Sequence, residues 1–254
     1  MGLLAEQPEI KIILSLAGRT KNPVLPQINH RIGGFGGVKG LADYIKQQNI
    51  TVIICATHPF ARKMPFNALE AAKIANIPLL YLLRPAWQAQ AGDKWTKVED
   101  HEEALSSCGV RSTSTGSQSP KKDPVQQLRR SQDDNLNIFL TVGRLELAQY
   151  AAAPQHFYVI RSIDEITEKP FKNAIYITAR PPFNMENERE LMRAHKINYL
   201  ITKNSGGTAT EAKLTAAREL GIPVILINRP PRPKGLHVAT ATQAMEWIQD
   251  IYKT

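Results

Sequence analysis

Two stretches of the chain that lie 145 residues apart have closely matching sequences, and this repeat restricts the fold more than any other feature. Ala72–Pro85 reads AKIANIPLLYLLRP and Ala217–Pro230 reads ARELGIPVILINRP, with Ile-Pro and Arg-Pro in the same register. The same offset aligns Thr57 with Thr202, and both residues follow short apolar runs. The sequence therefore predicts two related lobes, each containing a strand–loop–helix–strand unit that ends in Arg-Pro.

Short apolar runs alternate with helical patterns along most of the chain, which is typical of an α/β protein with parallel strands. We expect strands near residues 10–15, 51–56, 78–83, 137–142, 157–161, 173–178, 198–202 and 223–227. We expect helices near residues 38–48, 65–76, 144–152, 185–195, 208–220 and 239–252. The uninterrupted apolar character of 51–56 and 223–227 indicates strands that are covered on both faces.

The stretch from Glu102 to Asn135 breaks this alternation. It is rich in Ser and Thr, has balanced charge and contains almost no large apolar side chains. Burial of such a segment would not compensate for the entropy lost on ordering it. We therefore expect a first lobe over residues 1–101, a flexible linker or insertion over residues 102–135, and a second lobe over residues 136–254. The last helix of the second lobe is able to pack across to the first.

The positive charge of the chain is divided between these two lobes. The formal net charge is +9, of which residues 1–100 carry +5, residues 101–135 zero and residues 136–254 +4. A nucleic-acid-binding tail would concentrate its charge in one block, so we expect no nucleic-acid partner. The divided charge fits an anionic ligand held between the lobes, with an ordinary solvated basic surface as the alternative.

The sequence contains no pattern for a membrane segment, a secretory signal or a metal site. The longest apolar run, Val52–Ala56, is far shorter than the ~20 residues that span a bilayer. Residues 1–8 lack the basic start of a signal peptide. Two cysteines, Cys55 and Cys108, cannot build a disulfide framework or a CxxC metal site. We expect a cytoplasmic protein with no membrane partner and no bound metal.

Four loops at the expected carboxyl ends of strands, where open α/β sheets bind their ligands, have unusual sequences. The first is SLAGRT, residues 15–20. Arg19 and Thr20 suit the 2′-phosphate of NADP, because a guanidinium can bind a phosphate through two parallel hydrogen bonds. An exposed arginine after a strand is common, and this is the alternative interpretation.

The second loop is RIGGFGGVKG, residues 31–40. Its glycines allow the main chain to approach a ligand closely, and the helix that follows would direct its first N–H groups at an anion. A flexible turn is the alternative, but a structural turn seldom needs so many glycines. The glycines that we expect to contact the ligand are Gly33, Gly34, Gly36 and Gly37.

The third loop is ATHPF, residues 56–60, in which Thr57 and His58 emerge at a strand end. An imidazole in this position can donate a proton or bind a carboxylate near neutral pH, although a lone histidine is more often structural. Cys55, within the strand, is most simply a buried apolar residue.

The fourth loop is TKNSGGTAT, residues 202–210, which combines polar donors with two glycines before a helix. Such a combination forms a good anion-binding nest. The residues expected to bind an anion are Lys203, Asn204, Ser205, Gly206 and Gly207, together with Arg144 from the strand-end sequence TVGR. The RPPF sequence, residues 180–183, adds a further arginine to the same expected edge.

Taken together, SLAGRT, RIGGFGGVKGL, ATHPF, FLTVGR, TKNSGGTAT with the following EAKLTAAR, and the terminal Arg-Pro resemble the precorrin-6A reductase family, including its cobalt-precorrin members. The motifs follow the family's order over nearly the whole chain. The resemblance implies two Rossmann-like lobes with a cleft between them. It also implies that a nicotinamide nucleotide reduces one double bond of a corrin-precursor macrocycle in cobalamin biosynthesis.

The resemblance also suggests a role for each loop. NADPH, with NADH as the alternative, would be bound by the first lobe through Arg19, Thr20, Thr57 and the glycines of residues 33–37. The macrocycle, which carries many carboxylates, would be bound by the second lobe through Arg144 and residues 203–207. His58 would donate a proton or contact a carboxylate, and the enzyme would be a monomer or a homodimer.

The sequence departs from the family pattern in several places. Family members usually begin with a strand and a GGT-type glycine loop before the SLAGRT motif, whereas only residues 1–9 precede the first strand here. We expect this βα unit to be missing through a misassigned start or a truncated sequence rather than through divergence. Cys55 replaces a family Asp, and Pro181 replaces a Gly. The alternative function is a non-catalytic protein that binds a tetrapyrrole or a nucleotide.

Overall fold

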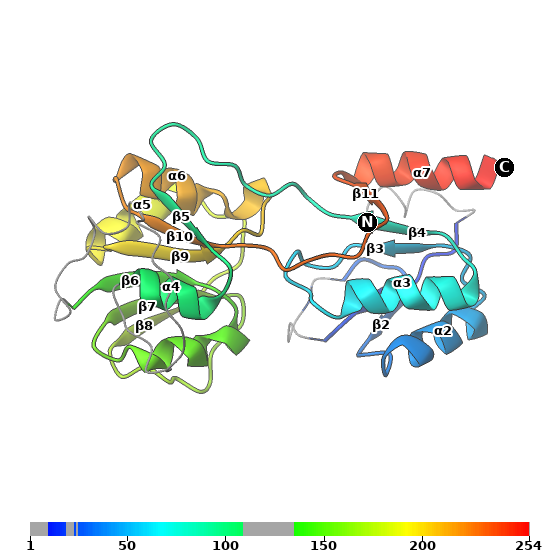
Figure 1. The fold of residues 1–254 in the computed structure, drawn as a ribbon, viewed down its shortest axis with the longest axis horizontal. Helices are drawn as coiled ribbons and strands as arrows, with labels where there is room; N and C mark the ends of the chain where they lie inside the picture. The colour runs from blue at the N-terminus through cyan, green and yellow to red at the C-terminus, as the bar shows by residue number, and fades with distance from the viewer. Residues whose placement is uncertain (1–9, 19–22, 24, 109–134, 254) are drawn as a thin grey trace, which may run out of the picture. The chain divides into compact units, whose positions relative to one another are not determined.

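The computed structural model describes residues 10–18, 23, 25–108 and 135–253. The chain forms two compact units, which we call unit 1 and unit 2. Unit 1 contains the described residues up to Pro85 and those from Pro230 onward, and unit 2 contains those from Ala86 to Arg229. Each unit is built on parallel strands (Figure 1), which confirms the predicted α/β class.

Unit 1 has two parallel sheets among its described strands. The strands are β1 (Leu14–Leu16), β2 (His30–Ile32), β3 (Ile53–Cys55), β4 (Leu79–Leu82) and β11 (Leu236–Val238). β1 pairs with β2, while the other three are ordered β11-β4-β3. The helices are α2 (Val38–Gln47), α3 (Met64–Ala75) and α7 (Ala241–Lys253). In Figure 1, α2 and α3 lie on one side of the β3–β4 sheet and α7 lies on the other, and Leu80 and Tyr81 of β4 are buried.

Unit 2 has one six-stranded parallel sheet with the order β5-β10-β9-β6-β7-β8. Its strands are β5 (Trp95–Val98), β6 (Asn137–Thr141), β7 (Phe157–Ser162), β8 (Ala174–Thr178), β9 (Tyr199–Lys203) and β10 (Val224–Ile227). Its helices are α4 (His101–Ser107), α5 (Met185–Ala194) and α6 (Ala212–Glu219), with the 3₁₀ segments η2 (Arg144–Ala152) and η3 (Thr208–Thr210). The chain runs outward from β6 to β8 and then returns to β9 on the other side of β6. This reversal is the topological switch point at which such sheets bind ligands.

The predicted repeat is present in the structure. β4 and β10 occupy equivalent residues at the 145-residue offset, and the helix before each ends in a left-handed residue, Asn76 with φ 53° and Gly221 with φ 66°. The predicted match of Thr57 with Thr202 is wrong by two residues. Tyr81 and Leu226 are equivalent at the 145-residue offset, but Tyr81 pairs with Cys55 while Leu226 pairs with Thr202. The chain from Thr202 to its partner Leu226 is two residues shorter than the chain from Cys55 to its partner Tyr81. Asn204 of unit 2 therefore occupies the position equivalent to Thr57 of unit 1.

The division between the units differs from the predicted boundaries. Residues 95–101 were expected in the first lobe, but they lie in unit 2, where β5 pairs with β10. The described residues from 230 onward belong to unit 1, where β11 pairs with β4. The prediction of a linker from residue 102 is wrong for residues 102–107, because they lie in α4, whose Asp100 side chain accepts the Glu103 N–H at 2.9 Å. Residues 109–134 lie outside the described part of the chain.

Candidate functional site

In unit 1, Arg31 fixes the conformation of the glycine loop, residues 31–37. Nη1 donates to Ser15 Oγ at 2.9 Å and to the main-chain oxygen of Gly33 at 3.0 Å, and Nη2 donates to the oxygen of Gly34 at 2.9 Å. The guanidinium also lies 3.9 Å from the centre of the Phe35 ring. Arg31 therefore joins the loop to Ser15 of β1 and occupies the main-chain oxygens of Gly33 and Gly34.

The glycine loop leads directly into α2. Gly37 is the N-cap with φ 94°, a value that favours glycine, and no side chain caps the helix. The first turn of α2 carries no acidic residue, so the partial positive charge of this helix end is available to an anion. Gly40 has no room for a side chain, because a Cβ there would lie 1.7 Å from the oxygen of Phe35. The four predicted glycines thus lie where exposed main chain meets a helix N-terminus.

Thr57 and His58 follow β3, as predicted. His58 is exposed, and its Nδ1 accepts the main-chain N–H of Phe60 at 3.2 Å, which places the proton of the neutral ring on Nε2. The hydroxyl and main-chain oxygens of Thr57 accept hydrogen bonds from Arg232, and so does the main-chain oxygen of His58. Cys55 is buried, as its apolar interpretation predicted.

In unit 2, two of the predicted residues lie on either side of the switch point. Arg144 is exposed at the start of η2, just beyond β6, and Lys203 ends β9. Lys203 Nζ lies 2.6 Å from Glu146 Oε1. Burial alone would raise the pKa of the Glu146 carboxyl, but the hydrogen bond and charge of Lys203 lower this pKa below its usual value. Lys203 is therefore a buried cation held at the carboxyl edge of the sheet by a partner carboxylate.

The conformation of the Lys203–Thr210 loop is fixed by hydrogen bonds with Trp87 and Arg229. The buried carboxamide of Asn204 accepts the Trp87 N–H at 2.8 Å and donates to the Trp87 oxygen at 3.3 Å. Arg229 donates to the main-chain oxygens of Asn204 and Ser205 at 2.8 and 3.1 Å. The Asn204 side chain, predicted to bind substrate, thus contacts the protein itself.

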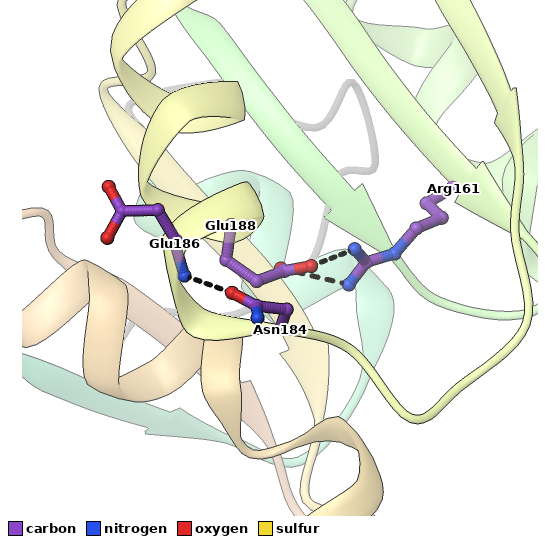
Figure 2. Close-up of polar contacts among 4 residues, drawn as sticks. All are labelled: Arg161, Asn184, Glu186 and Glu188. Atoms are coloured by element: carbon purple, nitrogen blue, oxygen red, sulfur yellow. Dashed lines mark hydrogen bonds and ion pairs between the residues drawn. The ribbon is translucent and has the colours of Figure 1, made fainter.

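The RPPF sequence lies beside this loop, because the Phe183 N–H donates to the oxygen of Ala209 at 3.1 Å. Phe183 also covers the guanidinium of Arg161 at 3.7 Å. Figure 2 shows that Arg161, at the end of β7, forms a double ion pair with Glu188 on α5. Both side chains are buried, so this pair connects a strand, a helix and the loop that precedes the helix.

Arg19 and Thr20 lie outside the described residues. Arg31, Trp87, Arg229 and Arg232 were not among the predicted site residues, and the recurring Arg-Pro was used only as a sign of the repeat and of the family resemblance. Within the described ranges, no group of three or more His, Cys, Asp or Glu side chains is placed to hold a metal ion. No helix in the described part of the chain is long and apolar enough to cross a membrane.

Comparison with known proteins gives matches that cover 75% or more of the chain. Residues 1–249 match the family described as precorrin-6x reductase CbiJ/CobK. The chain is 39% identical to a precorrin-6A reductase of Rhodobacter capsulatus, with 97% of this chain and 89% of the relative covered. It is 30% identical to a cobalt-precorrin-6A reductase of Priestia megaterium, with 75% and 69% covered. A solved structure of a CobK precorrin-6A reductase matches with 38% identity and a TM-score of 0.83, covering 98% of this chain and 90% of that chain.

Proposed function

This chain belongs to the precorrin-6x reductase CbiJ/CobK family, and from that premise we propose that it reduces one double bond of precorrin-6A, or of its cobalt form, in cobalamin biosynthesis. It is an oxidoreductase that uses a nicotinamide nucleotide. The observation that carries the proposal is the 39% identity to a precorrin-6A reductase over 97% of the chain. We propose that the enzyme acts in the cytoplasm as a monomer or a homodimer.

We assign the cofactor to unit 1 and propose that it is NADPH. The uncapped N-terminus of α2 and the exposed glycine main chain before it fit a phosphate group. Arg19 and Thr20 are proposed to bind the 2′-phosphate, and Thr57 to contact the cofactor near His58. Arg19→Ala should then raise KM for NADPH by about tenfold or more and leave KM for NADH unchanged, as expected for loss of a charged phosphate contact. Equal effects on both nucleotides would contradict this assignment.

We assign the macrocycle to unit 2. Arg144, Lys203 and Ser205, with the main-chain N–H groups of Gly206 and Gly207, are proposed to bind its carboxylates at the switch point between β6 and β9. The Lys203–Glu146 ion pair supports this role because it keeps a cation at this edge in one orientation. Asn204 contributes by shaping the loop, since its carboxamide bonds with Trp87.

The chemistry that the nicotinamide supplies when bound is a hydride. The protein must align the two ligands, exclude water and deliver a proton. We propose that His58 either donates this proton from Nε2 or contacts a carboxylate of the macrocycle. Its Nδ1 contact with the Phe60 N–H, at 3.2 Å, supports the proton-donor role because it fixes the tautomer and the ring orientation.

The direct test is the loss of NADPH absorbance when the purified chain is mixed with macrocycle made in place by the preceding enzymes of the pathway. We expect NADPH loss that requires both the chain and the macrocycle, with a product two hydrogens heavier by mass spectrometry. Tight binding of the macrocycle without NADPH consumption would contradict the proposal. It would instead support a non-catalytic binding protein.

A further inference from the structure

Trp87 contacts the Lys203–Thr210 loop at two points. Its main-chain N–H and oxygen bond with the carboxamide of Asn204 at 2.8 and 3.3 Å, and its indole Nε1 donates to the main-chain oxygen of Gly207 at 3.1 Å. Trp87 and Asn204 are each 6% exposed. The two contacts with Asn204 are therefore shielded from water, where a hydrogen bond has its full effect on conformation. The contact with Gly207 is partly buried.

The contact with Gly207 determines how the loop presents its main-chain donors. Gly206 and Gly207 have φ values of 67° and 81°, and glycines gain access to many other conformations when nothing fixes them. The indole holds the Gly207 carbonyl on the Trp87 side of its peptide. Because the C=O and the following N–H of a trans peptide point in opposite directions, the N–H of Thr208 is directed away from Trp87.

The indole ring is itself held in place. It belongs to the buried apolar cluster of unit 2, which includes Phe139, Leu200 and Leu214. The ammonium of Lys213, a buried residue of α6, lies 5.2 Å from the ring, within the range of a cation–π interaction. A ring fixed by the core and by α6 is a rigid reference for the loop that it contacts.

We propose that Trp87 is a positioning residue for the macrocycle site, acting through Gly207 and Asn204 to hold the N–H groups of the Lys203–Thr210 loop toward a substrate carboxylate. The inference rests on the proposed function. Trp87 touches neither ligand in this assignment. It fixes the direction of the main-chain N–H groups of this loop, which would otherwise lose their alignment. Trp87 therefore contributes to binding of the macrocycle and not to binding of the nucleotide.

The test compares Trp87→Phe with Trp95→Phe. Both substitutions replace an indole that packs against the same apolar cluster, but the buried Nε1 of Trp95 has no hydrogen-bond partner among the described residues. Trp87→Phe should raise KM for the macrocycle about 3- to 10-fold, the effect of one lost hydrogen bond, with KM for NADPH unchanged. Trp95→Phe should leave the KM for the macrocycle and the KM for NADPH within about twofold of the wild-type values, because it removes no hydrogen bond.

A second measurement does not depend on activity. Hydrogen–deuterium exchange followed by mass spectrometry should show faster exchange in peptides covering residues 203–211 for Trp87→Phe, but not for Trp95→Phe. Equal exchange in the two variants would overturn the inference. Faster exchange combined with an unchanged KM for the macrocycle, or with a raised KM for NADPH alone, would also overturn it. If wild type shows no turnover, the proposed function fails, while the exchange comparison still decides whether Trp87 positions the loop.

Discussion

Arg232 donates hydrogen bonds to both the hydroxyl and the main-chain oxygen of Thr57, each at 3.3 Å. The same guanidinium lies 3.3 Å from the oxygen of His58. In unit 2, Arg229 contacts the main-chain oxygens of Asn204 and Ser205, which are the positions equivalent to Thr57 and His58. Each unit thus uses an arginine from a segment distant in sequence to fix the residues that follow a strand.

Arg232→Lys should reduce kcat/KM for the overall reaction about tenfold, which corresponds to about 1.4 kcal/mol of transition-state stabilisation. A lysine ammonium keeps the charge, but it cannot reproduce the fork with which the guanidinium reaches three oxygens. Steady-state kinetics with both substrates varied would measure this effect. Lys234→Ala, an exposed position in the same segment, is the control and should leave kcat/KM unchanged. Similar kinetics for the two variants would show that Arg232 is dispensable.

His58→Asn separates the two roles proposed for this residue. The Asn side-chain oxygen can still accept the Phe60 N–H, but the side chain has no titratable proton. If His58 is the proton donor, kcat should fall about 10²-fold or more and KM should change little. If it contacts a carboxylate, KM for the macrocycle should rise with kcat retained. His237→Asn, at another exposed histidine of unit 1, serves as the control.

Removing one partner of the Arg161–Glu188 ion pair should lower the free energy of unfolding far more than replacing both partners. The two side chains are 6% and 2% exposed, so Glu188→Leu leaves a buried guanidinium without its carboxylate and should cost about 3–5 kcal/mol of unfolding free energy. Arg161→Met combined with Glu188→Leu should recover most of this loss, because it removes both buried charges. Urea unfolding measures both values. A single variant as stable as the double variant would contradict this account.

His156 should make the protein less stable in mild acid. Burial lowers the pKa of its imidazole from the ordinary value of 6.5, so the unfolded chain takes up this proton at a higher pH than the folded protein does. The resulting stability is fully present above pH 6.5 and is lost as the pH falls through the lower folded value. His156→Asn keeps an acceptor for the Leu136 N–H, which Nδ1 binds at 3.3 Å. Thermal melts should show a smaller decline for this variant than for wild type between neutral pH and pH ~5.

The strands and helices that the sequence predicted are those with long apolar or amphipathic patterns. β2, β5 and β11 were not predicted, because they contain only three or four residues of mixed polarity and depend on a neighbouring strand for their hydrogen bonds. Residues 144–152 form a 3₁₀ segment instead of the predicted helix, a difference that the spacing of apolar residues does not reveal. Local pattern therefore gave the architecture, while pairing between distant segments decided the short elements.

The candidate site was predictable in its loops but not in its supporting contacts. Glycine and polar residues after strands mark the loops by composition alone. Arg232 lies 174 residues from His58 and Trp87 lies 117 residues from Asn204, and no local pattern connects such residues. For the same reason, the sequence could not show that Lys203 is paired with Glu146 or that Asn204 bonds to main chain.

Gly40→Ala should disturb the glycine loop, residues 31–37, through packing alone. An added Cβ would lie 1.7 Å from the main-chain oxygen of Phe35, so the glycine loop must move away from α2. We expect a loss of about 1–3 kcal/mol in stability, as is typical of overpacking, with a raised KM for NADPH. Gly34→Ala is the control for stability only, because a Cβ there meets nothing within 4 Å and its melting temperature should match wild type. A normal melting temperature for Gly40→Ala would show that the loop and α2 are not in close contact in solution.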